Sequence, residues 1–185
     1  RACRAPDLRG HRLNQLLDLD ARWSQRLRVA EQPGALRRVA IILAHSGDSW
    51  FWGLGCLAVW LLGDGDWKYR ALAIVFGIAI TAVAVQAIKY AVKRPRPPGE
   101  WGQMYRAVDP HSFPSGHAAR VGMLAVLGAA IGPEWLALIL WIWAPLVALA
   151  RVAMGVHYVS DIAVGVALGA LFGALAAFLA PLVFA

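Results

Sequence analysis

Residues 71–92, with the sequence ALAIVFGIAITAVAVQAIKYAV, decide the fold class of this chain. Lys89 is the one charged residue in this run, and a helix of about 20 apolar residues is long enough to cross the hydrocarbon core of a bilayer. Four further apolar stretches approach that length, over residues 49–63, 118–131, 135–153 and 162–184. The sequence therefore predicts an all-α integral membrane protein, a helical bundle of about five transmembrane helices.

The composition favours the same class of protein. Of the 185 residues, 59% are hydrophobic and 16% are charged, whereas a soluble domain carries about 25% charged residues. These proportions disfavour a soluble enzyme and a disordered chain. The net charge of +7 does not by itself indicate a nucleic acid, because the distribution of the charges decides. We expect the bilayer as a partner and no nucleic acid.

The N-terminal residues 1–47 are expected to form an interfacial segment, and residues 48–185 the transmembrane domain. Over residues 11–31, apolar residues recur at roughly helical spacing among many charges; they are Leu13, Leu16, Leu17, Trp23 and Leu27. This stretch is too charged to span, and its pattern favours an amphipathic helix on the membrane surface. The alternative is a soluble helix packed on the loops. Residues 39–44 are expected to form a short helix that dips into the membrane.

The last apolar stretch contains Gly165, Gly169 and Gly173, one every four residues. Small residues at this spacing form a groove on one helix face, and such grooves let helices approach closely in lipid. We expect this face to point into the bundle.

Ionisable residues at membrane depth are costly and are functional candidates for that reason. In this chain they gather at three joints between the predicted spans. These joints contain Lys89, Lys93, Arg94 and Arg96; then His111, Ser115, Gly116 and His117; then Arg151, His157 and Asp161. Five spans bring all three joints to one side of the membrane, so we expect one anion site there.

The residue types at these joints suit a phosphoryl group. Lys89, Arg96 and Arg151 are cations that can neutralise its oxygens, and the two arginines can bind them bidentately. Ser115 is a good helix N-cap and Gly116 lets the backbone approach closely. The free N–H groups of the helix that begins there can bind phosphate.

Two histidines and an acid complete the predicted chemistry. His157 and Asp161 are spaced i, i+4 and are expected on one helical face. The carboxylate can accept the Nδ1 proton of the imidazole, which leaves Nε2 as an in-line nucleophile. His117 would then protonate the leaving alkoxide. Metal binding by these three residues is disfavoured, because the nearby cations would repel a metal ion.

Other polar residues near the joints have simpler interpretations. Snorkelling or topology is favoured for Lys93, Arg94 and Arg120. Tyr105 is interpreted as an interface anchor. Arg106 and His111 are candidates for contacts with a lipid headgroup.

The three joints together resemble the type 2 phosphatidic acid phosphatase family, whose pattern is K-x6-RP, then PSGH, then SR-x5-H-x3-D. In this chain the pattern is Lys89-x6-Arg96-Pro97, Pro114-Ser115-Gly116-His117 and Arg151-x5-His157-x3-Asp161. The resemblance extends from about residue 71 to the C-terminus. One position departs from the pattern, since Ala150 stands where the family has serine.

The resemblance implies a reaction. His157 forms a phospho-histidine intermediate, Asp161 orients it, and His117 is the general acid. The phosphoryl oxygens are held by Lys89, Arg96, Ser115, the Gly116 backbone and Arg151. The reaction needs no metal and no cofactor.

The expected function is therefore a lipid phosphatase. Its substrate is a polyprenyl phosphate or diphosphate, phosphatidic acid or phosphatidylglycerol phosphate, and the sequence does not separate them. Two alternatives stay open, a lipid phosphotransferase that uses the same histidine and a non-catalytic phospholipid-binding membrane protein.

The distribution of positive charge predicts an orientation. In a five-span topology, every Lys and Arg except Lys68 and Arg70 lies on the side of the site. The positive-inside rule then puts the site on the cytoplasmic face, and we expect a bacterial cytoplasmic membrane. The resemblance favours the opposite face, because many relatives have six spans and an outward-facing site.

Overall fold

The computed structural model describes residues 8–184, so residues 1–7 of the predicted interfacial segment lie outside it, as does the side chain of Leu13. The described residues form eight helices and no strand. The helices are α1 (Leu8–Arg26), α2 (Ala35–Ser46), α3 (Ser49–Leu62), α4 (Gly65–Val92), α5 (Glu100–Arg106), α6 (Gly116–Ile131), α7 (Glu134–Ala153) and α8 (Val159–Phe184).

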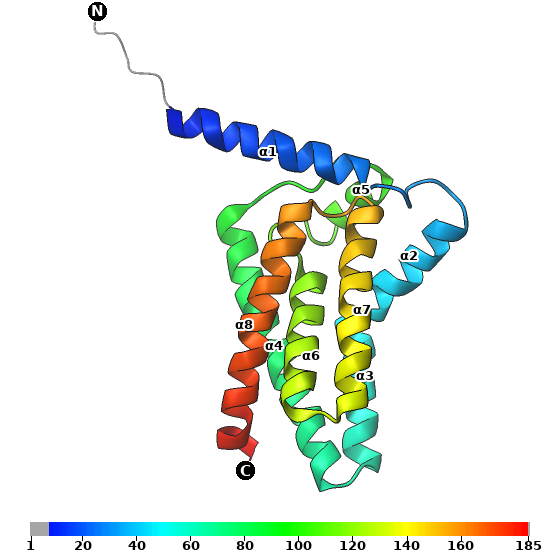
Figure 1. Ribbon diagram of the computed structural model, residues 1–185, viewed down its shortest axis with the longest axis vertical. Helices are drawn as coiled ribbons and strands as arrows, with labels where there is room; N and C mark the ends of the chain where they lie inside the picture. The colour runs from blue at the N-terminus through cyan, green and yellow to red at the C-terminus, as the bar shows by residue number, and fades with distance from the viewer. Residues whose placement is uncertain (1–7, 185) are drawn as a thin grey trace, which may run out of the picture.

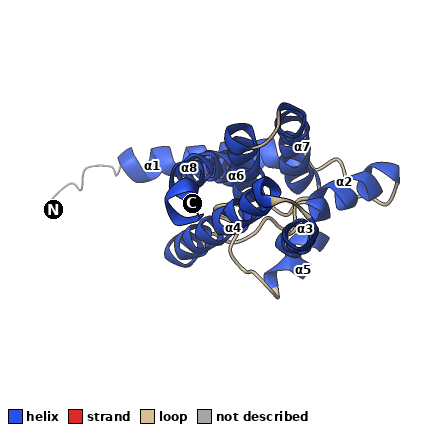
Figure 2. Ribbon diagram, turned by 90° about the horizontal axis from the view of Figure 1, so that it is seen from below, coloured by secondary structure: helices blue, strands red, loops and turns tan. Residues whose placement is uncertain are grey.

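Five of these helices run side by side as a bundle, and α6 is at its centre, in contact with α4, α7 and α8 (Figures 1 and 2). Among the described residues, α4, α7 and α8 are long and apolar enough to cross a membrane. The other two, α3 and α6, are shorter apolar helices of 14 and 16 residues. The predicted all-α membrane bundle is confirmed, with a count of spans that is approximate.

The outer faces of the bundle helices are apolar. Leu62 on α3, Val83 on α4 and Phe178 on α8 are 87%, 72% and 70% exposed. A soluble monomer rarely exposes apolar surface of this extent. These faces fit contact with lipid, because apolar side chains that face lipid tails are not exposed to water.

Backbone contact between α6 and α8 depends on glycine. A Cβ atom built on Gly169 would lie 1.9 Å from the carbonyl oxygen of Ala119, and one on Gly173 would lie 2.7 Å from that of Met123. A side chain at either position would therefore separate the two helices. The predicted glycine groove faces the bundle interior, as its spacing indicated.

Helix α1 lies across one end of the bundle (Figure 1) and meets it through polar groups. The Asp20 carboxylate accepts a hydrogen bond from the Ser160 N–H at 3.0 Å, and Ser24 Oγ accepts one from the Val159 N–H at 2.9 Å. The first N–H groups of a helix have no intrahelical partner, so α1 caps α8. Trp23 remains 59% exposed. A polar face of this helix therefore packs on the start of α8, and its contact with the membrane surface stays a prediction.

Helix α2 extends over more residues than the predicted 39–44. Its Ala40 and Ala44 are buried in a cluster with Ala150 and Met154 at the end of α7. Ala150, which replaces the family's serine, is therefore a core residue of the α2–α7 contact.

Candidate active site

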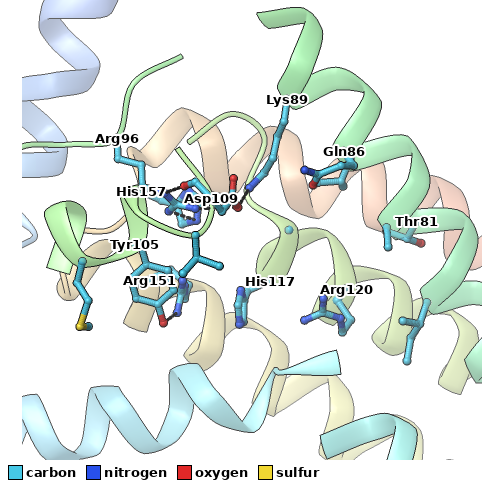
Figure 3. A pocket seen from close by; sticks show the side chains of 16 residues that line it. Thr81, Gln86, Lys89, Arg96, Tyr105, Asp109, His117, Arg120, Arg151 and His157 are labelled. Atoms are coloured by element: carbon cyan, nitrogen blue, oxygen red, sulfur yellow. Dashed lines mark hydrogen bonds and ion pairs between the residues drawn. The ribbon is translucent and has the colours of Figure 1, made fainter. Parts of the chain in front are cut away.

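The three predicted joints meet at the end of the bundle that α1 crosses, around a cavity of about 420 Å³ (Figure 3). The residues of the predicted site that line it are Lys89, Arg96, Gly116, His117, Arg151 and His157. Asp161 and Ser115 are fully buried and support the wall from behind. The cavity also contains Tyr105, Asp109 and Arg120, which the sequence did not assign to the site.

His157 lies in the loop between α7 and α8, so the predicted common helical face of His157 and Asp161 is wrong. Helix α7 ends at Ala153 and α8 begins at Val159, and Gly155 between them has φ of 69°, a conformation that glycine adopts readily. The loop still brings the pair together. His157 Nδ1 lies 3.5 Å from Asp161 Oδ2, which is longer than a normal hydrogen bond.

The tautomer of His157 follows from its other nitrogen. Nε2 lies 3.3 Å from Arg96 Nη1, and a guanidinium can only donate. Nε2 therefore accepts, and we assign the proton to Nδ1, which faces Asp161. Burial, together with Arg96 and Arg151, holds the pKa of His157 well below its ordinary value. The imidazole is neutral at neutral pH, and its Nε2 is unprotonated, with a lone pair that accepts from Arg96.

Lys89 and Arg96 share one carboxylate. Lys89 Nζ forms an ion pair with Asp109, and Arg96 Nη2 lies 2.9 Å from the same Oδ2 atom. Arg96 Nε also donates to the Asp109 carbonyl at 2.7 Å. Burial works to raise the pKa of Asp109, but the two cations outweigh it and hold that pKa below its ordinary value. A carboxylate thus occupies the cations that the sequence assigned to phosphate.

Tyr105 orients two guanidinium groups, so its interpretation as an interface anchor is wrong. Its hydroxyl accepts a hydrogen bond from Arg151 Nη1 at 3.2 Å. The guanidinium carbon atoms of Arg151 and Arg96 lie 4.8 and 5.4 Å from the centre of its ring. Cations at these distances are attracted by the ring face, and the phenol therefore aligns both arginines at the cavity wall.

His117 is held by an acid from a distant part of the chain. Helix α6 begins at Gly116, as Pro114-Ser115-Gly116 predicted, with Ser115 as its N-cap. His117 Nε2 lies 2.6 Å from Oδ1 of Asp48 in the loop between α2 and α3. Burial works to raise the pKa of Asp48, but hydrogen bonds with His117 and His45 lower it below its ordinary value. Asp48 is therefore a carboxylate that fixes one nitrogen of His117.

Two arginines assigned to snorkelling are instead engaged in the interior, so that interpretation is wrong for both. Arg94 Nη1 lies 2.7 Å from Asp161 Oδ1, and its Nη2 lies 2.7 Å from Asp20 Oδ2. Arg120 lines the cavity and donates to the Gly47 carbonyl. Lys93 is exposed at the end of α4, where the topological interpretation still applies.

Arg106 and His111 do not line the cavity. Arg106 is exposed, with its Nε bonded to the Gly102 carbonyl at 3.2 Å, and the His111 ring packs edge-on against Tyr90. Their contacts with a headgroup stay a prediction. Among the described residues, no three His, Cys, Asp or Glu side chains are grouped to hold a metal ion.

A buried, neutral histidine that faces several cations at the end of an apolar helical bundle is the arrangement that an integral membrane phosphatase needs. Residues 70–182 match the family model of the PAP2 superfamily. The chain belongs to this superfamily and is a membrane lipid phosphatase, as the three joints predicted.

Curated relatives agree with this assignment, and solved structures share the fold. The chain is 45% identical over 155 residues to decaprenylphosphoryl-5-phosphoribose phosphatase of Mycobacterium tuberculosis, covering 80% of this chain and 81% of the relative. It is 27% identical over 176 residues to lipid A 1-phosphatase of Rhizobium etli, covering 80% and 73%. The fold is similar to that of a PAP2 type phosphatidylglycerolphosphate phosphatase from Bacillus subtilis, with a TM-score of 0.72, 23% identity and coverage of 92% and 88%. It is also similar to LpxE of Aquifex aeolicus, with a TM-score of 0.65, 21% identity and coverage of 82% and 92%.

Proposed function

We propose that this protein hydrolyses a phosphate ester of an isoprenoid lipid through a phospho-histidine intermediate on His157. The observation that carries the proposal is the environment of His157, which is 1% exposed and presents an unprotonated Nε2 beside Arg96 and the cavity. The choice of an isoprenoid lipid is supported by the relative at 45% identity, which is named for a decaprenyl-linked phosphoribose.

Binding of the phosphoryl group begins with an exchange of anions. Asp109 now neutralises Lys89 and Arg96, and a phosphoryl group that arrives takes its place on both cations. Arg151, aligned by Tyr105, contributes a third cation. Charge-assisted hydrogen bonds of this kind are about twice as strong as neutral ones. The Gly116 end of α6 adds backbone N–H groups, and Ser115 caps that helix.

The first chemical step transfers the phosphoryl group to the enzyme. The Nε2 lone pair of His157 forms a bond to phosphorus while the bond from phosphorus to the leaving oxygen breaks. Asp161 keeps the Nδ1 proton directed away from the reacting atom. His117 gives a proton to the leaving oxygen. Because Asp48 holds the Nε2–H of His117, the proton must leave from Nδ1, so His117 acts as an imidazolium, a form that the negative charge of the bound phosphoryl group favours.

The second step reverses these roles. Water attacks phosphorus, His117 takes back a proton from that water, and the bond between phosphorus and His157 breaks. The products are inorganic phosphate and the restored enzyme, so the two steps balance without an outside reagent.

The test is phosphate release by the detergent-solubilised protein, with EDTA present, from prenyl diphosphate and monophosphate, phosphatidic acid and phosphatidylglycerol phosphate. We expect the prenyl lipids to be hydrolysed fastest and His157→Gln to abolish release. Phosphate that moves between two lipids without release would favour the phosphotransferase. Lipid binding without either reaction, unchanged in His157→Gln, would favour the non-catalytic alternative.

The site is proposed to open on the cytoplasmic face of a bacterial cytoplasmic membrane, with residues 1–47 as an interfacial segment at the same face. The charge distribution supports this. In the five-span topology only Lys68 and Arg70, in the first turns of α4, lie at the opposite end of the bundle, and every other Lys and Arg lies on the side of the site. Val108 lies between α5 and α6, lines the cavity and is 88% exposed. A Val108→Cys variant that lacks Cys3 and Cys56 should resist an impermeant thiol reagent in intact cells and react after permeabilisation. Labelling in intact cells would contradict this orientation.

A further inference from the structure

The cavity continues past the catalytic histidines into the bundle. Helix α4 contributes Lys89 near the mouth and also Val85, Ala82 and Ile78. With a rise of 1.5 Å per residue, Ile78 lies about 16 Å along the helix from Lys89. A substrate whose phosphate sits among the cations therefore has a mostly apolar path for its lipid chain between α4 and α6, with Thr81 and Gln86 as the polar side chains that α4 adds to it.

Arg120 stands where that path begins. It follows His117 by three residues on α6, so it lies on the same helix face about 4.5 Å further into the bundle. Both residues line the cavity, and Figure 3 draws His117 between Arg151 and Arg120. An arginine at this depth is costly to keep and points to a function.

The guanidinium of Arg120 has unused capacity. It has five N–H donors, and one of its nitrogens bonds to the Gly47 carbonyl. Among the described residues no carboxylate lies within ion-pair distance of it. Asp48, in the same loop as Gly47, attracts it from further away and is itself bonded to His117 and His45. Two other cations of the cavity, Lys89 and Arg96, share Asp109, while Arg151 is bonded to the Tyr105 hydroxyl.

The reaction geometry decides which part of the substrate reaches Arg120. In an in-line displacement the leaving oxygen is opposite the attacking Nε2 of His157, next to the acid His117. The group attached to that oxygen then lies beyond His117, beside Arg120. A neutral alcohol offers a guanidinium a single uncharged acceptor, whereas a second phosphoryl group is an anion that matches its planar fork.

We infer that Arg120 forms a second anion subsite, which selects lipids whose leaving group carries another phosphoryl group. The inference rests on the proposed function and specifies its substrate class. A prenyl diphosphate meets the requirement directly, because its leaving group is a prenyl phosphate. A prenyl-phosphoryl sugar phosphate meets it with the two phosphoryl groups separated by the sugar.

The test compares two lipids that have the same tail, geranylgeranyl diphosphate and geranylgeranyl monophosphate. Arg120→Gln should lower kcat/KM for the diphosphate about 10- to 100-fold, the range for a lost hydrogen bond to a charged group, and leave the monophosphate near the unchanged protein. Arg120→Lys, which keeps the charge without the fork, should fall between. A third substrate, a prenyl-phosphoryl ribose 5-phosphate, tests the distance between the two phosphoryl groups. If Arg120→Gln lowers kcat/KM more for this lipid than for the diphosphate, the subsite favours two phosphoryl groups that are separated by a sugar.

Two results would overturn the inference. Equal losses on both lipids would mean that Arg120 acts through the Gly47 loop, and no loss on either would mean that it contacts no substrate.

Binding separates this inference from the proposed function. In a His157→Gln background, which cannot form the intermediate, the diphosphate should bind more tightly than the monophosphate, and adding Arg120→Gln should remove the difference. This result holds even if the unchanged protein releases no phosphate, which would contradict the proposed function alone. An unchanged preference after Arg120→Gln would refute the subsite.

Discussion

The two ends of the helical bundle use arginine in different ways. At the end away from the site, Arg70 Nε donates to the carbonyl of Ile131 at 2.9 Å, and its guanidinium lies 4.8 Å from the Trp67 ring centre. It completes the last turn of α6. At the site end, Arg96 and Arg151 are aligned by Asp109 and Tyr105 and line the cavity. An arginine of this bundle therefore indicates function when its polar groups face the cavity, and structure when they satisfy a helix end.

The largest expected effect is that of Asp161→Asn. An amide there offers a donor to Nδ1 of His157 and favours the tautomer with its proton on Nε2, which cannot attack phosphorus. We expect kcat to fall about 10²- to 10⁴-fold, the range for such a change in a catalytic triad. The measurement is phosphate release together with thermal stability.

Asp20→Asn is the matched control for that variant. Asp20 contacts Arg94, as Asp161 does, but not His157, so its activity should stay near that of the unchanged protein. Equal losses in the two variants would mean that Arg94, rather than the tautomer of His157, is the sensitive group.

Substitutions in the glycine groove between α6 and α8 should lower the stability of the fold more than they change the catalytic steps. Gly169→Leu places a side chain where a Cβ atom already lies 1.9 Å from the Ala119 oxygen, and overpacking of this kind costs about 1–3 kcal/mol. Thermal unfolding in detergent measures the loss. Leu171→Phe, at a position on α8 that is 63% exposed, is the control and should be near neutral. If both variants were equally stable, the two helices would be free to separate.

A smaller effect should appear in the pH dependence of stability. The pKa of folded His157 lies below its ordinary value because of burial, Arg96, Arg151 and Lys89. As pH falls through about 6.5, the unfolded chain binds a proton that the folded chain does not, and stability decreases. Unfolding midpoints from pH 8 to pH 5 should therefore fall, and His157→Gln should flatten part of this slope. An identical slope in that variant would mean that other groups cause it.

The smallest expected effect is that of Arg70→Gln. It removes a cation from the carboxyl end of α6, where such charges contribute about 0.3–1 kcal/mol. Thermal stability should fall slightly and phosphate release should not change. Arg151→Gln, at the site end, should abolish most phosphate release and leave thermal stability nearly unchanged. A loss of activity in Arg70→Gln would remove the distinction between the two ends.

The sequence predicted the residues whose spacing along one helix or turn carries information. Lys89, Arg96 and the Pro114–His117 turn are near helix ends, and the glycines of α8 are one turn apart. It did not predict Asp48, which is 69 residues from His117, because the loop that brings them together follows no periodic pattern. Asp109 and Tyr105 were missed for a similar reason. His157 was placed on a helix because the i, i+4 spacing allows it, but Gly155 ends α7 and the helix restarts only at Val159.

The close contact of α6 and α8 has a consequence for catalysis. The Ser115 N–H donates to the Asp161 carbonyl at 3.0 Å, so the start of one helix is tied to the start of the other. Below that bond the glycines let the two backbones touch, which prevents either helix from sliding along its neighbour. The acid at the top of α6 and the carboxylate at the top of α8 are thus kept at a fixed interval by residues that have no chemistry of their own.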